Sequence, residues 1–103
     1  MIQITEIAPG YFRFESVWTA KPQKTPTALL VTLTLTGPDG IETEQKLTWT
    51  PPVNRMRLRE GSLDLAEQIS AVQSWRAVQI DDEISIGVAD PEHYSGRVEM
   101  ELR

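Results

Sequence analysis

The 103-residue chain contains no cysteine, a single histidine and no long apolar run, and each absence excludes a class of site. Without cysteine there is no disulfide, no catalytic thiolate and no thiolate ligand for zinc or an iron–sulfur cluster. A nucleophilic triad or a zinc site would have to use His93, beside other donors. The sequence contains no G-x-S-x-G motif, no Walker loop and no dinucleotide-binding glycine pattern. We therefore predict a protein that is not an enzyme and uses no cofactor.

Signals for export or membrane insertion are also missing. The first ten residues, MIQITEIAPG, have neither a basic start nor an apolar stretch of signal-peptide length. No run approaches the ~20 apolar residues that a membrane-spanning helix needs. We expect a cytoplasmic protein that does not bind membranes, with a place in a virus particle as the alternative.

The composition is that of one globular domain covering residues 1–103. Hydrophobic residues make up 40% and charged residues 24% of the chain, which is enough to build one core but not two. The formal net charge is −5. An acidic domain is a poor general ligand for phosphate backbones, so nucleic acid is not the expected partner.

The clearest pattern in the chain is a long β-hairpin over residues 27–50. Successive side chains of a strand point to opposite faces, so strict alternation indicates one face toward a core and one toward water. The turn is Gly37-Pro38-Asp39-Gly40, in which proline presets φ and glycine accepts a positive φ. The predicted inner face consists of Leu29, Val31, Leu33, Leu35, Leu47 and Trp49.

The alternation also fixes the length of the loop. A three-residue loop, with Gly40 in the left-handed position of a bulged turn, pairs apolar residues of one arm with apolar residues of the other. A two- or four-residue loop would pair odd with even positions and expose one apolar set. The predicted cross-strand pairs are Leu29 with Trp49, Val31 with Leu47, Leu35 with Thr43, Thr32 with Lys46 and Thr34 with Glu44.

Other parts of the chain predict shorter elements. Alternating runs indicate strands near residues 2–4, 11–20, 54–60, 78–80, 84–88 and 98–102. Asp64 as N-cap, with Glu67 three residues later, predicts a helix over 64–74. The segment between 78 and 88 reads either as a hairpin with an acidic turn or as one bent strand. The predicted fold is mainly β, a sandwich or small barrel of about seven strands with one packed helix, and its element order is also that of an OB-fold.

Two sets of residues are candidates for binding a partner. Arg55, Arg57 and Arg59 would project side by side from a strand over 54–60, and guanidinium groups pair bidentately with carboxylate or phosphate. A solvated strand face is the favoured interpretation of these arginines. Thr32 and Thr34 lie on the outer face of the long hairpin, where β-branched residues suit an exposed strand.

A metal site is a weaker candidate. Two acidic segments contain the carboxylates that calcium or magnesium prefers, but their spacing matches no EF-hand loop, so solvated turns are the favoured interpretation. A carboxylate- or metal-dependent enzyme would need both segments to meet in one concavity. The candidate ligands are Asp81, Asp82 and Glu83 in the first segment and Asp90, Glu92 and His93 in the second.

The leading functional hypothesis is a non-catalytic protein-interaction or assembly module, with copies of the chain itself as one partner. In architecture alone, small acidic β-domains with one helix are similar to phage-particle accessory proteins, such as tail, connector or capsid-cementing components. A small acidic inhibitor belongs to the same class. One alternative is an OB-like binder of single-stranded nucleic acid, which requires Trp18, Trp49 or Trp75 exposed beside the arginines. The other is the small enzyme described above.

Overall fold

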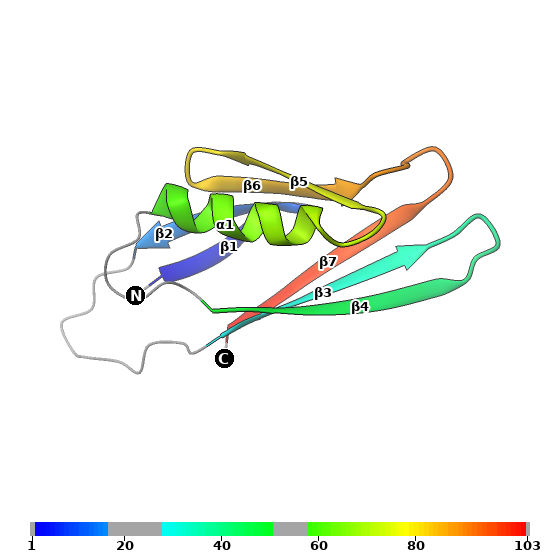
Figure 1. Ribbon diagram of the computed structural model, residues 1–103, viewed down its shortest axis with the longest axis horizontal. Helices are drawn as coiled ribbons and strands as arrows, with labels where there is room; N and C mark the ends of the chain where they lie inside the picture. Colours follow the sequence, from blue (N-terminus) through cyan, green and yellow to red (C-terminus); the bar gives the residue numbers. More distant parts are fainter. Residues whose placement is uncertain (1, 17–27, 51–57, 103) are drawn as a thin grey trace.

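The computed structural model describes residues 2–16, 28–50 and 58–102 (Figure 1). These residues form seven strands and one helix, so the prediction of a mainly β fold with one helix is confirmed. In chain order the elements are β1 Ile2–Ala8, β2 Tyr11–Ser16, β3 Leu29–Thr36, β4 Glu42–Trp49, α1 Leu58–Ser70, β5 Trp75–Ile80, β6 Glu83–Val88 and β7 Ser95–Leu102.

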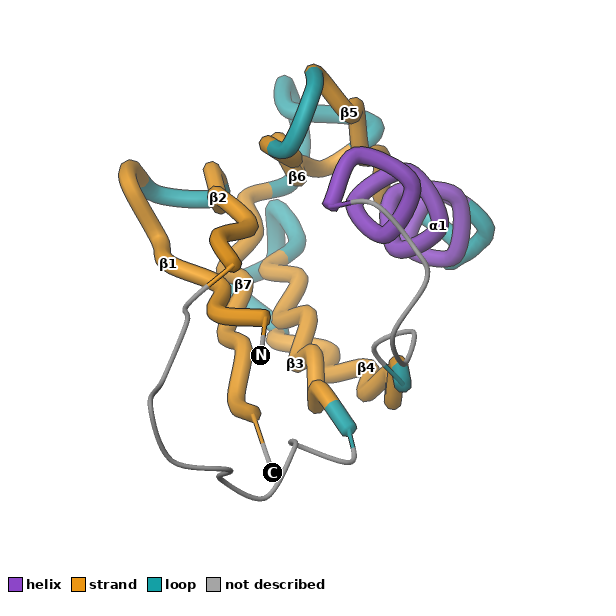
Figure 2. Tube along the Cα trace, turned by 90° about the vertical axis from the view of Figure 1, so that its left-hand side faces the viewer, coloured by secondary structure: helices purple, strands orange, loops and turns teal. Residues whose placement is uncertain are grey.

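The strands form two antiparallel sheets. Sheet A has the order β1-β2-β6-β5 and sheet B the order β4-β3-β7. Helix α1 packs against β5, β6 and β2, and the end-on view places it at the side of the molecule between β5 and β4 (Figure 2). Because β2 pairs with β1 and β6 and not with the β3–β4 hairpin, the described strands do not follow the pairing of an OB-fold.

The long hairpin has the predicted register. Leu29 pairs with Trp49, Val31 with Leu47, and the pairing continues without a shift to Thr36 and Glu42. At the turn, Gly37 N donates to Ile41 O at 3.1 Å, Gly40 N donates to Gly37 O at 3.0 Å, and Gly40 has φ +80°. These are the bonds of a three-residue bulged turn, so the predicted loop is confirmed.

One core lies between the two sheets and the helix. Both sheets and α1 contribute fully buried side chains, and the Phe14 and Trp49 rings pack with centroids 5.8 Å apart. The predicted inward position of Trp49 is confirmed, and Trp18 lies outside the described residues. The buried hydrophobic residues are Phe12, Phe14, Leu29, Val31, Leu33, Trp49, Leu65, Ala66, Ile69, Trp75, Ile84, Ile86 and Val98.

The helix begins and ends earlier than the predicted range 64–74. It covers Leu58–Ser70, so residues 58–60 are helical where a strand over 54–60 was predicted; residues 54–57 lie outside the described part. Asp64 is in the middle of the helix and does not cap it. Gly61 and Ser62, which look like a break in the sequence, are buried inside the helix, and the Ser62 hydroxyl lies 3.0 Å from both Arg59 O and Asp81 O.

The segment from 75 to 88 is a hairpin, which settles the alternative that the sequence left open. β5 and β6 are joined by the two-residue turn Asp81–Asp82, and Asp81 has a φ of +55°. The inner side of β5 presents Trp75 and Ala77 to the helix and core, whereas Val78 and Ile80 point outward. In the described ranges no helix is long and apolar enough to cross a membrane.

Candidate functional site

The three arginines do not form a described patch. Arg59 is exposed in the first turn of α1, and Arg55 and Arg57 lie outside the described residues. Because Arg59 stands on a helix and not on a strand, alternation cannot place it on one face with the other two. The two described tryptophans, Trp49 and Trp75, are buried, so neither offers a stacking surface for a nucleic acid base.

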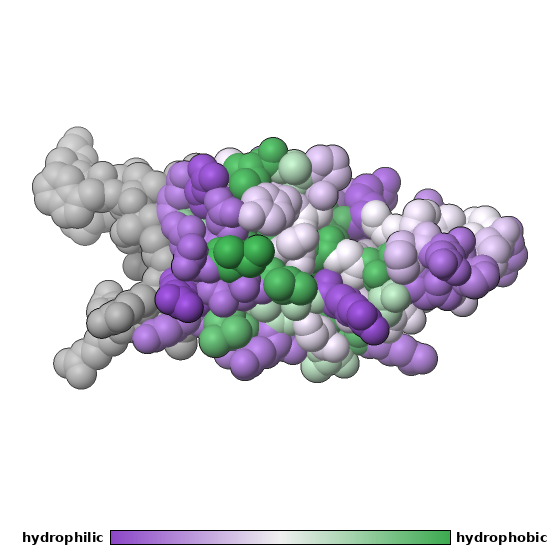
Figure 3. Space-filling view, turned by 90° about the horizontal axis from the view of Figure 1, so that it is seen from above, coloured by the Kyte–Doolittle hydropathy of each residue, from purple (hydrophilic) through white to green (hydrophobic). Residues whose placement is uncertain are grey.

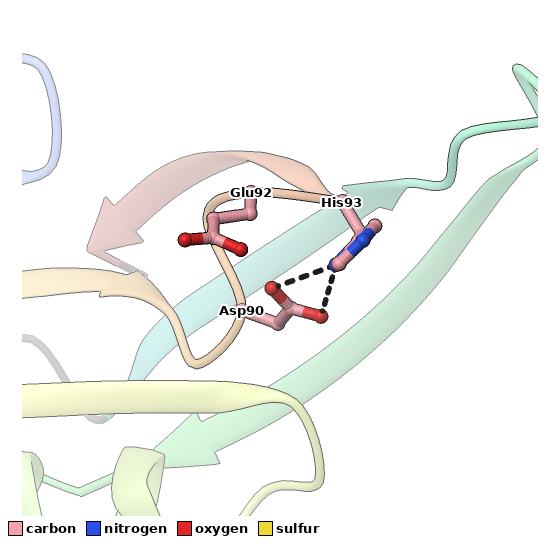
Figure 4. Close-up of side chains that lie close together, drawn as sticks. All are labelled: Asp90, Glu92 and His93. Carbon is pink, nitrogen blue, oxygen red and sulfur yellow. Dashed lines mark hydrogen bonds and ion pairs between the residues drawn. The ribbon is translucent and has the colours of Figure 1, made fainter.

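The two acidic segments lie apart. Asp81 and Asp82 form the turn at one end of β6, and residues 90–93 follow its other end (Figure 1). In the second segment His93 Nδ1 lies 2.9 Å from Asp90 Oδ2, and a Glu92 carboxylate oxygen is within 4.8 Å of both ligand groups (Figure 4). All three side chains are exposed. The contact between His93 and Asp90 lies within a surface turn. This segment and the segment Asp81, Asp82 and Glu83 do not meet in one concavity.

The outer face of sheet B contains a ladder of opposite charges around the threonine row. Thr34 is flanked by Glu44 on β4 and Arg97 on β7, and Thr32 by Lys46 and Glu99. Glu44 and Lys46 are 3.5 Å apart along β4, and Arg97 and Glu99 are 3.2 Å apart along β7. As a result Thr34 is only 7% exposed. The flanking charged side chains are therefore much more exposed on this face than Thr34 is.

Both edges of sheet A are obstructed. The Ser70 hydroxyl accepts a hydrogen bond from Ala77 N and donates one to Ala77 O, both at 3.1 Å, so α1 caps the outer side of β5. β1 contains a register shift between Glu6 and Ala8, which is a device that distorts an edge. Neither edge of sheet A therefore presents a regular, open strand. In sheet B, β7 is also an edge strand, and it pairs with β3 without a shift.

The side of β4 that faces away from β3 is unpaired along the described chain, and we call it the β4 edge. Glu42 to Lys46 are exposed on both faces of the strand, and the pairing with β3 runs without a bulge. Hydrogen-bonded pairs alternate along an antiparallel ladder, and Gly37 bonds to Ile41. The N–H and C=O groups of Glu42, Glu44, Lys46 and Thr48 therefore point away from β3.

A second feature lies on the outer face of sheet A. Glu83 accepts hydrogen bonds from the Tyr11 hydroxyl and from Arg13 Nε and Nη2, the latter two at 2.9 and 2.7 Å. The bond from Tyr11, followed by that from Arg13, lowers the pKa of Glu83, and the same Glu83 contact raises the pKa of Tyr11 and of Arg13. The cluster joins β2 to β6 across the short stretch where these strands pair.

Exposed apolar side chains stand beside this cluster. Val78 and Ile80 of β5 are 59% and 57% exposed, and the space-filling view from this side shows hydrophobic groups among hydrophilic ones along the middle of the face (Figure 3). Sequence reasoning missed the cluster because residues 11 and 83 are far apart in the chain. The only signal available was that Tyr11, Arg13 and Glu83 have outward parity on their strands.

The Glu83 cluster leads to a prediction about pH. A carboxyl group whose pKa is lower in the folded than in the unfolded state stabilises the fold above its unfolded pKa, about 4.3 for glutamate, and the effect disappears as pH falls through the folded pKa. Glu83→Gln should therefore melt below the wild type at pH 7, and the difference in Tm should vanish toward pH 2. Thermal unfolding from pH 7 to 2 measures this, with Glu42→Gln as the control for loss of one exposed charge. A constant difference across the range would contradict the prediction.

No protein-family model, curated protein or solved structure matches this chain. The β4 edge, the outer faces of the two sheets and the acidic turn are therefore the features from which a function can be inferred.

Proposed function

We propose that this chain is a non-catalytic protein-interaction and assembly module, which binds by adding a partner's β-strand to the β4 edge. The observation that supports this most directly is the run Glu42–Lys46, exposed on both faces and with its outward backbone groups unpaired by any described strand. Such an edge is a template for strand addition, in which main-chain hydrogen bonds supply affinity and alternate side chains supply specificity.

The narrower form of the proposal is an accessory component of a virus particle, in which small β-rich subunits assemble with each other and with neighbours. The net charge of −5 supports a partner with a basic surface. If the chain is an acidic inhibitor, it binds that partner through the same β4 edge. The nucleic acid alternative draws no support from Trp49 or Trp75, because both are buried. The enzyme alternative draws none from the two acidic segments, because β6 separates them.

The test uses proline to block one outward N–H. Residue 44 points its N–H away from β3, so Glu44→Pro removes a donor for a partner strand without breaking the hairpin. A photocrosslinking amino acid at position 42 then reports what lies beside the edge in the source cell. We expect a crosslinked protein when position 44 is Glu, and at least a tenfold lower yield in Glu44→Pro, because strand addition requires that donor.

Glu44→Thr is the matched control, because it removes the same charge but keeps the N–H and suits a strand. It should retain the crosslink, and both variants should keep the circular dichroism spectrum and the cooperative melting of the wild type. Equal yields from Glu44→Pro and Glu44→Thr, or no crosslink from the wild-type edge, would show that β4 is not the binding edge.

A further inference from the structure

Glu44 and Lys46 of β4 carry opposite charges, so β4 strands of two molecules can pair with Glu44 of each facing Lys46 of the other. We propose that the strand added to the β4 edge is β4 of another molecule of this chain, antiparallel and centred on Gln45, so that sheet B continues across a two-fold axis as a six-stranded sheet. This inference rests on the proposed function and specifies its partner, register and contacts.

The backbone limits the possible registers. The outward N–H and C=O groups belong to the even-numbered residues Glu42, Glu44, Lys46 and Thr48, as the Gly37–Ile41 bond and the ladder alternation require. In a symmetric pair, even residues must therefore face even residues. Directly opposed residues also share a face of the sheet, so the outer faces of both copies lie on the same side.

The side chains select one of the remaining registers. Centred on Gln45, the pairing sets Glu44 opposite Lys46 of the second copy, and by symmetry this contact occurs twice. Centred on Glu44, it would set Glu42 opposite Lys46 twice but would also set two glutamates opposite each other at the axis, and centred on Lys46 it would set two lysines opposite each other. Opposite charges directly across a strand pair stabilise it and like charges destabilise it. The mixed signs on β4 thus oppose pairing in the wrong register and favour one symmetric arrangement.

The other face of the strand agrees with this register. Ile41 is 64% exposed at the outer end of the hairpin, where it contributes nothing to the core of its own molecule. In the register centred on Gln45 it faces Trp49 of the second copy, and Thr43 faces Leu47. Pairing would therefore cover an apolar side chain that is exposed in the single chain, which adds a hydrophobic contribution to the hydrogen bonds and ion pairs.

The experiment is a charge exchange read by sedimentation equilibrium or light scattering over a concentration series. Glu44→Lys sets lysine against lysine in the dimer, and Lys46→Glu sets glutamate against glutamate, so each should weaken the dimer Kd by about tenfold or more. A mixture of the two single variants restores both ion pairs in a heterodimer and should associate as the wild type does. The double variant Glu44→Lys/Lys46→Glu should also associate normally.

The Arg97–Glu99 pair on β7 supplies matched controls, because it occupies the same outer face on the opposite edge strand. Arg97→Glu changes the net charge as Lys46→Glu does, and Glu99→Lys changes it as Glu44→Lys does. Both should leave the dimer Kd unchanged. Equal weakening by the β7 variants would show that net charge alone governs association, and would overturn the inference.

Failure of this inference is distinguishable from failure of the proposed function. If the wild type stays monomeric to about 1 mM, while the crosslink at position 42 still joins it to a different protein and still depends on the N–H of residue 44, the second copy is not the partner and strand addition stands. If the wild type dimerises but the mixture of single variants does not recover, the register is wrong. If neither association nor a crosslink occurs, both proposals fail.

Discussion

Replacing Trp49 with alanine should lower the free energy of unfolding by about 3–5 kcal/mol, the range measured for removal of a large buried aromatic side chain. Trp49 is 2% exposed at the end of β4 and packs against Phe14 of sheet A. Its indole Nε1 also donates a hydrogen bond of 2.7 Å to Asp64 Oδ2 on α1. One side chain therefore joins sheet B to sheet A and to the helix. Urea denaturation of the wild type and the variant measures the change.

The packing and hydrogen-bond contributions of Trp49 can be separated. Trp49→Phe keeps an aromatic ring but removes the N–H donor, and Asp64→Ala removes the acceptor while leaving the ring in place. A hydrogen bond to a charged group contributes about 1.5–3 kcal/mol, so each variant should lose less than Trp49→Ala does. The double variant Trp49→Phe/Asp64→Ala should lose less than the sum of the two single losses, because both act on one bond. Strict additivity would show that the bond does not contribute.

The hydrogen bond from Trp49 to Asp64 lies at the end of β4 that is away from the exposed run Glu42–Lys46. Among the described strands only β3 pairs with β4, and from Glu42 to Lys46 both faces of β4 are exposed. The strand is held at its other end, where Trp49 enters the core and contacts α1. Trp49→Phe should therefore leave the register of the hairpin intact, so association can still be measured in a less stable protein.

The long hairpin could be predicted in detail from the sequence, because several local signals agree there. The period of two separates Leu29, Val31 and Leu33 from the threonines, and only one loop length keeps the apolar residues of both arms on one face. A shift of one residue in the register would turn the apolar side chains of one arm toward water, so the hydrophobic pattern selects a single register. The exposed state of Ile41 was not predicted, since parity gives a face and not how far the core extends beneath it.

The start of the helix could not be predicted for a different reason. Residues 54–60 alternate as a strand does, and Gly61-Ser62 resembles a break, yet residues 58–70 form one helix. The small residues at 61 and 62 are buried, and the Ser62 hydroxyl reaches the backbone of Asp81 in the β5–β6 turn. Tertiary packing therefore keeps Gly61 and Ser62 within a helix, although local propensity predicts that they interrupt one. The prediction that Arg59 lies on a strand, on which the arginine patch depended, is wrong for the same reason.

Sequence reasoning identified residues of the candidate site but not the site itself. Glu44 and Lys46 were predicted to pair with Thr34 and Thr32 on the outer face of the hairpin, but β4 is an edge strand only because the third strand of sheet B pairs with β3 and not with β4. That strand is β7, more than fifty residues after β3 along the chain. Long-range pairing of this kind leaves no local periodicity in the sequence. The same holds for the Tyr11–Arg13–Glu83 cluster, which forms only when β2 pairs with β6.

Gly10→Ala should destabilise the protein by about 2–4 kcal/mol, because two separate costs fall on one position. Gly10 ends the β1–β2 turn with a φ of +75°, in the left-handed region that residues with a Cβ rarely adopt. A Cβ there would also lie 2.6 Å from Ile86 O, a backbone atom of β6. Gly10 O accepts a hydrogen bond of 2.7 Å from Ile86 N, so the clash falls where β2 meets β6.

Gly40→Ala separates the two costs. Gly40 has a φ of +80° in the β3–β4 turn, and no atom lies within 4 Å of a Cβ built on it. Alanine at this position should cost only the left-handed conformation, about 1–2 kcal/mol. The difference between the two variants in urea denaturation then measures the contact with β6. Equal losses of stability in the two variants would mean that β6 moves away from residue 10 at little energetic cost. That result would contradict tight packing between the β1–β2 turn and β6. A larger loss at residue 10 is the expected result, because only residue 10 adds the contact with β6 to the left-handed conformation.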